Sequence, residues 1–157
     1  MAPSLLFDIN EFDLQKVSID AEGVEKVIPH RGHMRMLDGV FHLADDFSHA
    51  LGYHDVRNDE FWVEGHIPGR PILPGVMMIE TAAQLASFVM LNRIGAHRFI
   101  GFTGTDNVRF RGQVVPGDRL YILVVELKFS PRRFVCASQG IVNGQIVFEA
   151  TIKGMPI

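Results

Sequence analysis

The segment Gly75–Leu91 constrains the fold of this chain more than any other stretch, because it predicts a helix that is apolar on nearly every side. Pro74 precedes it, and a proline is well tolerated at the start of a helix, where its missing N–H costs nothing. Other elements must cover most of the surface of such a helix. Its few polar residues are Glu80, Thr81, Gln84 and Ser87. We interpret the stretch as too short and too polar to span a bilayer.

Most of the sequence around this helix is typical of β-strands. Asn143-Gly144 is a strong hairpin signal, because both residues tolerate positive φ. The expected strands are residues 34–44, 48–56, 107–111, 120–128, 134–142 and 145–153. A short helix is expected to begin after Ser18 or Asp20 and to end at Ile28. A buried helix and a long, mostly antiparallel sheet predict an α+β fold in which the sheet wraps the helix.

Length and composition narrow the class of protein. The 157 residues are expected to form one domain over residues 1–157, with residues 1–18 as a loosely attached N-terminal segment. The net charge of −3 argues against a general affinity for nucleic acid or acidic membranes. The sequence has one cysteine, Cys136, which rules out an intrachain disulfide and favours a reducing compartment. Since the N-terminus also lacks a signal-peptide pattern, we expect a cytoplasmic protein.

Two titratable side chains in and before the long helix can carry acid–base chemistry. Glu80 lies in the second turn among apolar residues, where burial favours the protonated carboxyl, and Gln84 follows within hydrogen-bonding reach. His66 precedes the helix in a loop rich in glycine and proline, and imidazole suits proton abstraction near neutral pH. Taken singly, each also fits a structural role, as a salt-bridged carboxyl or a histidine bonded to loop backbone.

The N-terminus of the helix supplies a third group. The N–H groups of Gly75 and Val76 have no intrahelical acceptor, and the helix dipole favours a developing oxyanion here. Gly75 also lets a ligand approach the backbone closely. Eliminating water from a β-hydroxyacyl thioester needs a base, an acid and a donor to the thioester oxygen. His66, Glu80 and the Gly75 N–H match these roles in that order.

Three segments carry a family resemblance. The stretch from Gly65 to Gln84, GHIPGRPILPGVMMIETAAQ, closely resembles the signature of FabZ-type (3R)-hydroxyacyl-acyl carrier protein dehydratases in the FabA/FabZ-like family. Pro29-His30-Arg31, followed by Leu37-Asp38, is similar to that family's N-terminal motif. Residues 108–118 are similar to its late strand and turn, and the resemblance extends over residues 24–154.

The resemblance implies a hotdog fold, with a long central helix wrapped by an antiparallel sheet. It implies a homodimer, often assembled into a hexamer, in which His66 of one subunit faces the partner subunit's Glu80. It implies that the Gly75 N–H holds the thioester carbonyl and that Gln84 supports Glu80. The implied activity is that of a hydro-lyase that forms trans-2-enoyl thioesters in fatty acid biosynthesis, without a cofactor and with acyl carrier protein as the partner.

Three positions depart from the family pattern. Gly32, followed by His33, stands where the family usually has an aromatic residue that is often proposed to gate the acyl tunnel. Arg35 replaces an apolar residue, and Ile67 replaces the phenylalanine after the catalytic histidine. These changes spare the chemistry and bear on the gate, on the preferred acyl length and on the pathway that the protein serves.

Outside these motifs, Arg109 and Arg111 share one face of a strand, opposite Val108 and Phe110. They are candidates for docking the acidic carrier protein or the phosphate of its pantetheine arm, with a solvated strand face as the alternative. The remaining histidines show no metal-ligand spacing, and we expect no metal site. They are His30, His33, His42, His49, His54 and His97.

Two other functions fit a hotdog fold. A hotdog thioesterase would use an acid on the same helix to direct water and would not need His66. A non-catalytic subunit that binds acyl chains or carrier protein typically lacks one member of the catalytic pair. Because the sequence holds both His66 and Glu80, it favours the dehydratase.

Overall fold

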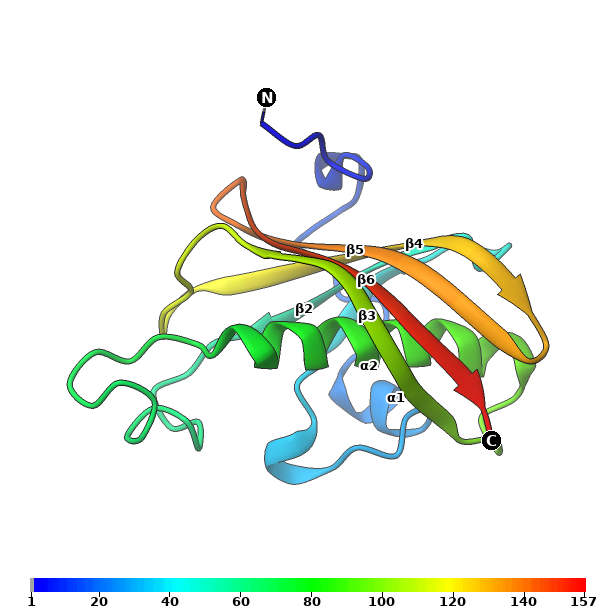
Figure 1. Cartoon of the computed structure of the whole chain (residues 1–157), viewed down its shortest axis with the longest axis horizontal. Helices are drawn as coiled ribbons and strands as arrows, with labels where there is room; N and C mark the ends of the chain where they lie inside the picture. Colours follow the sequence, from blue (N-terminus) through cyan, green and yellow to red (C-terminus); the bar gives the residue numbers. More distant parts are fainter. Residues whose placement is uncertain (1) are drawn as a thin grey trace.

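The computed structural model describes residues 2–157 (Figure 1). Within this range the helices are two α-helices, α1 (Ala21–Glu25) and α2 (Gly75–Ile94), and two short 3-10 helices, Ile9–Glu11 and Gly32–Met34. The strands are β1 (Gly39–Leu43), β2 (His49–Asp55), β3 (Ile100–Phe110), β4 (Arg119–Ser130), β5 (Arg133–Val142) and β6 (Gln145–Pro156).

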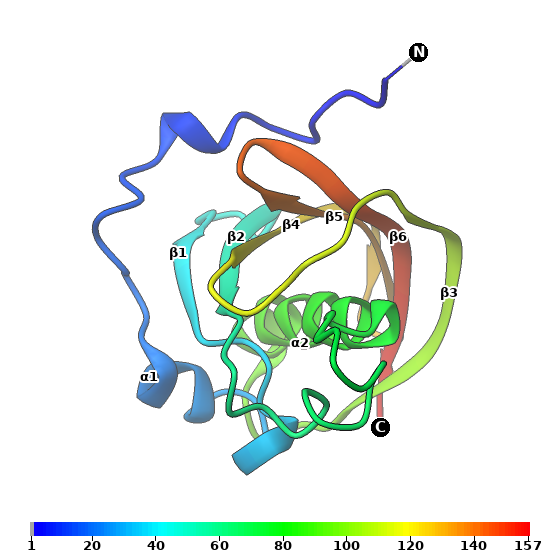
Figure 2. The same cartoon turned by 90° about the vertical axis from the view of Figure 1, so that its left-hand side faces the viewer.

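The strands of residues 2–157 form one six-stranded sheet in the order β1-β2-β4-β5-β6-β3, and each neighbouring pair is antiparallel. Figure 2 shows this sheet curling around α2, which lies along its concave side. The predicted α+β hotdog architecture is therefore confirmed.

Helix α2 begins at the predicted residue and continues beyond Leu91 to Ile94. Gly95 ends it with φ of 111° and donates its N–H to the carbonyl of Leu91. The large side chains of Leu85 and Phe88 are fully enclosed beneath the sheet. Each such side chain stabilises the fold by about 1.5–3 kcal/mol through its removal from water.

We interpret residues 75–91 as too short and too polar to span a bilayer, but the observed helix Gly75–Ile94 is longer. By length and composition alone it could cross a membrane, with a mean hydropathy of 1.2 over 18 residues. However, 56% of this window is buried inside the fold. The burial accounts for the apolar composition, because a helix wrapped by a sheet must be apolar on most sides.

Element boundaries near the N-terminal half differ from the predictions. The Asp20 side chain caps α1 by accepting from the Gly23 N–H, but the α-helix ends at Glu25 and not at Ile28. The first strand begins at Gly39 instead of Met34, because residues 32–34 form a 3-10 turn. The hairpin prediction is confirmed, with positive φ at both residues of the turn at 143–144.

The N-terminal segment, expected to be loosely attached, lies along the outer face of the sheet, on the side away from α2 (Figure 2). Residue 1 lies outside the described residues. Phe7 and Phe12 pack with Leu51 and Leu123 in a second apolar cluster. The Leu6 N–H also donates to Oε1 of Gln139 over 2.8 Å.

Candidate active site

Glu80 lies in the second turn of α2 with its side chain 28% exposed, and it is therefore less buried than we expected. The hydrogen bond that the spacing predicted is present, because Nε2 of Gln84 donates to Oε1 of Glu80 over 2.8 Å. Nε2 of His30 lies 3.5 Å from the same oxygen. Thus two side chains from different parts of the chain approach one oxygen of this carboxylate.

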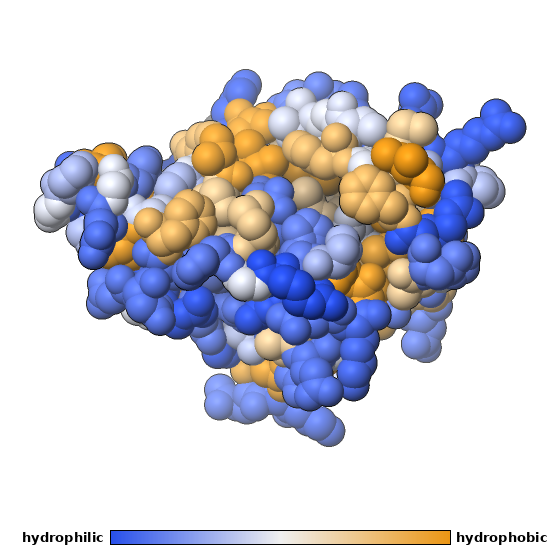
Figure 3. Space-filling view, turned by 90° about the horizontal axis from the view of Figure 1, so that it is seen from below, coloured by the Kyte–Doolittle hydropathy of each residue, from blue (hydrophilic) through white to orange (hydrophobic). Residues whose placement is uncertain are grey.

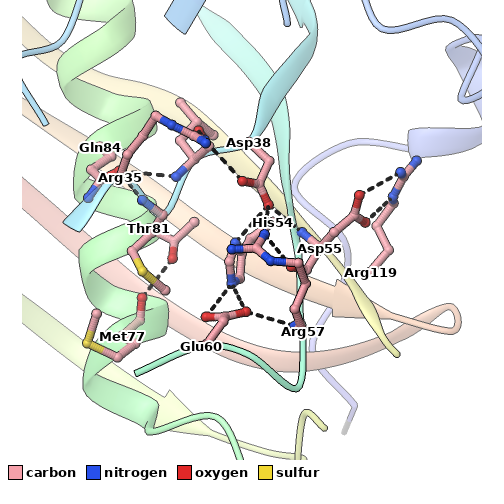
Figure 4. Close-up of polar contacts among 12 residues, drawn as sticks. Arg35, Asp38, His54, Asp55, Arg57, Glu60, Met77, Thr81, Gln84 and Arg119 are labelled. Carbon is pink, nitrogen blue, oxygen red and sulfur yellow. Dashed lines mark hydrogen bonds and ion pairs between the residues drawn. The ribbon is translucent and has the colours of Figure 1, made fainter. Parts of the chain in front are cut away.

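Gln84 is 1% exposed, and hydrogen bonds fix its amide at both ends. Its Oε1 accepts from the N–H groups of Met36 at 2.8 Å and Leu37 at 3.1 Å. Its Nε2 donates to the Met34 carbonyl at 2.6 Å, in addition to Glu80. Figure 4 shows Gln84 on α2 beside the chain segment that precedes β1. Since Oε1 faces two backbone donors, the amide nitrogen has to point toward Glu80.

His66 lies in the loop between β2 and α2, which projects past the N-terminal end of α2 (Figure 1). Its Nδ1 lies 2.6 Å from the Ile72 carbonyl, and its backbone N–H donates to the Trp62 carbonyl at 2.8 Å. Because a carbonyl can only accept, Nδ1 carries the hydrogen and Nε2 of the neutral ring keeps a lone pair. Ile67, directly after it, has a φ of 57°, a strained value for a β-branched residue.

His66 and Glu80 do not meet within a protomer. Among the interactions of residues 2–157, no hydrogen bond or ion pair joins these two side chains. The imidazole therefore lies on the loop before α2 and the carboxyl on α2 itself, with no direct contact between them.

The Gly75 N–H has no acceptor among the described residues, as expected for the first turn of a helix. The structure gives a packing reason for a glycine here, in addition to the predicted close approach of a ligand. A Cβ at this position would lie 2.7 Å from Cε1 of Phe110. A larger residue at this position would therefore require the half-exposed Phe110 ring of β3 to shift.

A buried polar cluster that no sequence pattern indicated lies beside this loop and is drawn in Figure 4. His54 of β2 is 1% exposed, with Nδ1 2.9 Å from Oδ2 of Asp38 and Nε2 2.9 Å from Oε1 of Glu60. Burial alone would lower the pKa of His54, but the hydrogen bonds and charges of Asp38 and Glu60 raise it to about 9. His54 is therefore an imidazolium that donates to both carboxylates at neutral pH.

This cluster fixes the start of the loop that carries His66. Nε1 of Trp62 donates to Oε2 of Glu60 at 2.8 Å, and the Arg57 N–H donates to Oε1 at 2.9 Å. The Trp62 carbonyl in turn accepts from the His66 N–H. A chain of hydrogen bonds thus runs from β2 to the backbone of His66.

Arg35, which stands where the family pattern has an apolar residue, joins α1 to this cluster. Its Nε donates to Glu25 at 2.9 Å, and its Nη1 donates to Oδ1 of Asp38 at 3.0 Å. Gly32 has a φ of 58° in the turn before it. Within residues 2–157, no group of three or more His, Cys, Asp or Glu side chains is arranged to hold a metal ion.

Arg109 and Arg111 point away from the core, while Val108 packs against the core and Phe110 contacts Phe148, as the alternation predicted. Both arginines line a shallow cavity of about 300 Å³ on the outer face of the sheet. Arg111 forms an ion pair with Glu149 there, which offsets its charge.

The fold and these side chains define a class, that of hotdog-fold proteins with an imidazole before the central helix and a carboxyl in its second turn. The profile of the FabA-like domain family matches residues 28–151, and the chain belongs to this family.

Curated relatives cover most of the chain. The 3-hydroxyacyl-acyl-carrier-protein dehydratase FabZ of Rhizobium rhizogenes is 38% identical over 141 residues, which cover 88% of this chain and 88% of the relative. The dehydratase of the same name from Sinorhizobium medicae is 37% identical over 139 residues, or 87% of this chain and 88% of the relative.

Solved structures share the fold. A chain of the dehydratase heterocomplex ApeI:P from Xenorhabdus doucetiae has a TM-score of 0.73 at 18% identity, with coverage of 85% of this chain and 90% of that chain. Cj0977, a virulence protein of Campylobacter jejuni, has a TM-score of 0.67 at 14% identity, with coverage of 89% and 94%. At these identities the likeness shows the hotdog architecture alone.

Proposed function

We propose that this protein is a (3R)-hydroxyacyl-acyl carrier protein dehydratase, a hydro-lyase of fatty acid biosynthesis. Its membership of the FabA-like family and its identity to proteins named FabZ dehydratases support the reaction. The observation that carries the proposal is the hydrogen bonding of His66 and Glu80, which leaves one reactive atom of each side chain free of described partners. The hydrogen bond of His66 Nδ1 to the Ile72 carbonyl leaves Nε2 as the nitrogen with the lone pair in a neutral ring, and Glu80 is held by Gln84 with Oε2 unoccupied by any described residue.

In the proposed reaction, Nε2 of His66 takes the α-proton of the thioester, and the electron pair moves toward the thioester oxygen. The Gly75 N–H donates to that oxygen as its negative charge grows. Glu80 gives a proton to the β-hydroxyl, the C–O bond breaks, and water leaves with formation of the trans-2-enoyl product. His66 ends with one proton more and Glu80 with one fewer, and proton exchange restores both. The base and the acid each contribute about 10²–10⁴ in rate.

We further propose that the site is completed in a homodimer, which can assemble into a hexamer, because no hydrogen bond or ion pair joins His66 to Glu80 among residues 2–157. Strand β3 ends the sheet order, and an edge strand with unpaired N–H and C=O groups favours pairing with another chain. The large side chains of Phe102 on β3 and Val76 on α2 are exposed. Figure 3 also shows apolar surface on the face seen from below.

The partner that delivers the substrate is proposed to be acyl carrier protein. Arg109 is exposed on β3 and can meet an acidic surface, whereas Arg111 is already paired with Glu149. We propose a cytoplasmic site of action, in line with a single free cysteine. Burial raises the pKa of the Cys136 thiol to about 12, so this thiol is unreactive.

The test is an assay of wild type, His66→Ala and Glu80→Gln on a short and a long (3R)-hydroxyacyl-carrier-protein substrate. We expect enoyl product from wild type and a loss of about 10²–10⁴-fold in kcat for each variant. Free acid and enoyl product should be measured separately. If wild type releases only free acid, the protein is a thioesterase, and if it releases neither product, it is a binding subunit.

A further inference from the structure

We propose that His30 is a positioning residue for Glu80. Together with Gln84 it holds Oε1 of the carboxyl, so that Oε2 is the oxygen presented to the substrate hydroxyl. The inference rests on the proposed function, because it concerns how the acid of that reaction is aimed.

The contact is with one oxygen of Glu80. Nε2 of His30 lies 3.5 Å from Oε1, the oxygen that also accepts from Gln84. The distance is within ion-pair reach and longer than a normal hydrogen bond. Contacts of this kind commonly shorten when substrate binds. No described residue pairs with Oε2, which leaves that oxygen available for the reaction.

The ring of His30 can face Glu80 favourably in one neutral tautomer. Its Nδ1 is buried, and among buried side-chain nitrogen and oxygen atoms of residues 2–157 it alone has no partner. A hydrogen on Nδ1 would be a buried donor without an acceptor, and the lone pair of Nε2 would then face a carboxylate oxygen. With the hydrogen on Nε2, the ring donates toward Glu80 and leaves an unpaired acceptor in the interior.

The charge state of His30 agrees with this tautomer. Burial holds the pKa of His30 below 6.5, although the charge of Glu80 opposes the shift and that of Arg31 adds to it. The ring is therefore neutral near pH 7. A neutral donor can orient the carboxyl without forming the strong ion pair that an imidazolium would form.

The backbone around His30 is fixed independently of α2. Nη1 of Arg31 donates to the carbonyls of Ile28 and His30, each at 2.8 Å. Its Nη2 donates to the Glu25 carbonyl at 2.7 Å, which satisfies the end of α1. Pro29 restricts the preceding backbone. Pro29-His30-Arg31 is thus a rigid segment. It brings an imidazole to Glu80 from a part of the chain that lies outside the motif at residues 65–84.

The experiment compares His30→Leu, which removes the donor, with His30→Gln, whose amide can replace Nε2. The control is His97→Leu, because His97 is exposed in the loop after α2, at the end of the helix far from Glu80. On a short hydroxyacyl-carrier-protein substrate, we expect kcat of His30→Leu to fall about 10- to 100-fold while KM changes less than about twofold, as for a misplaced acid. His30→Gln should recover most of the loss, and His97→Leu should match wild type.

Two kinetic outcomes would overturn the inference: an unchanged kcat in His30→Leu, or no recovery in His30→Gln when both variants unfold at the wild-type temperature. A second measurement does not depend on activity, and its main readout needs only the wild type. Imidazole ¹⁵N NMR of wild type should show His30 protonated on Nε2, with its signals displaced in Glu80→Gln. Protonation on Nδ1 would exclude the proposed contact. A wild type without dehydratase activity would refute the proposed function, while the NMR result would still decide the contact.

Discussion

Oε1 of Gln84 accepts from two backbone N–H groups, and its Nε2 donates to a carbonyl and to Glu80. At the scale of single residues, this one amide bonds both to the buried backbone before β1 and to Glu80 of the candidate site. Its loss should therefore affect stability and activity together, unlike the loss of a group that contacts Glu80 alone.

We predict that Gln84→Leu lowers the free energy of unfolding by about 3 kcal/mol, because buried backbone groups of residues 34–37 lose their partners. It should also lower kcat, since Glu80 loses its donor. Chemical denaturation and steady-state kinetics measure the two effects. Gln145→Leu is the matched control, because Gln145 is exposed at the start of β6. Equal stability of the two variants would mean that Gln84 does not hold the segment before β1.

The close approach of the Phe110 ring to Gly75 is a second feature at the scale of single residues. We predict that Gly75→Ala destabilises the fold by about 1–3 kcal/mol, because the new methyl group would overlap the Phe110 ring. In a double-mutant cycle, Phe110→Ala should relieve this cost. If the double variant regains stability but not activity, the glycine also serves the approach of substrate to the N–H. If Phe110→Ala brings no relief, the explanation from packing is wrong.

At the scale of elements, the cluster of Asp38, His54 and Glu60 joins β2 to the loop before α2. The pKa of His54 is about 9 in the folded protein against 6.5 for an ordinary histidine, so the folded state holds its proton more tightly. The stabilisation is complete below pH 6.5 and is lost as the pH rises through 9.

We predict that the free energy of unfolding falls by up to about 3 kcal/mol between these two pH values. Urea unfolding at a series of pH values measures it. His54→Gln should show a flat profile over the same range, because its side chain is neutral throughout. A wild-type profile as flat as that of the variant would show that the carboxylates do not hold an extra proton on His54.

At the scale of the whole molecule, the proposed homodimer would pair through the edge strand β3 and would bring His66 of one subunit to Glu80 of the other. We predict that Phe102→Glu weakens the dimer and lowers activity in parallel, because it places a charge on the exposed edge. Light scattering and activity over a range of protein concentrations measure the two effects. Leu127→Glu on β4 is the control, as a similarly exposed apolar residue. A monomeric wild type with full activity would contradict the shared site.

Patterns between near neighbours in the sequence predicted much of the fold. The apolar composition of residues 75–91 indicated the central helix, and Asn143-Gly144 indicated the final hairpin. The spacing of Glu80 and Gln84 predicted their hydrogen bond. These signals are readable because helix periodicity and turn chemistry act over a few residues.

Contacts between distant residues came from the folded chain. His54 pairs with Asp38, sixteen residues away, through the register of β2 with the segment before β1. His30 reaches Glu80, and Phe110 fills the space beside Gly75, although neither pair is close in sequence. The partial exposure of Glu80 also follows from how much of α2 the sheet covers. Such features depend on strand pairing and on how the sheet closes around the helix, which no local pattern of residues encodes.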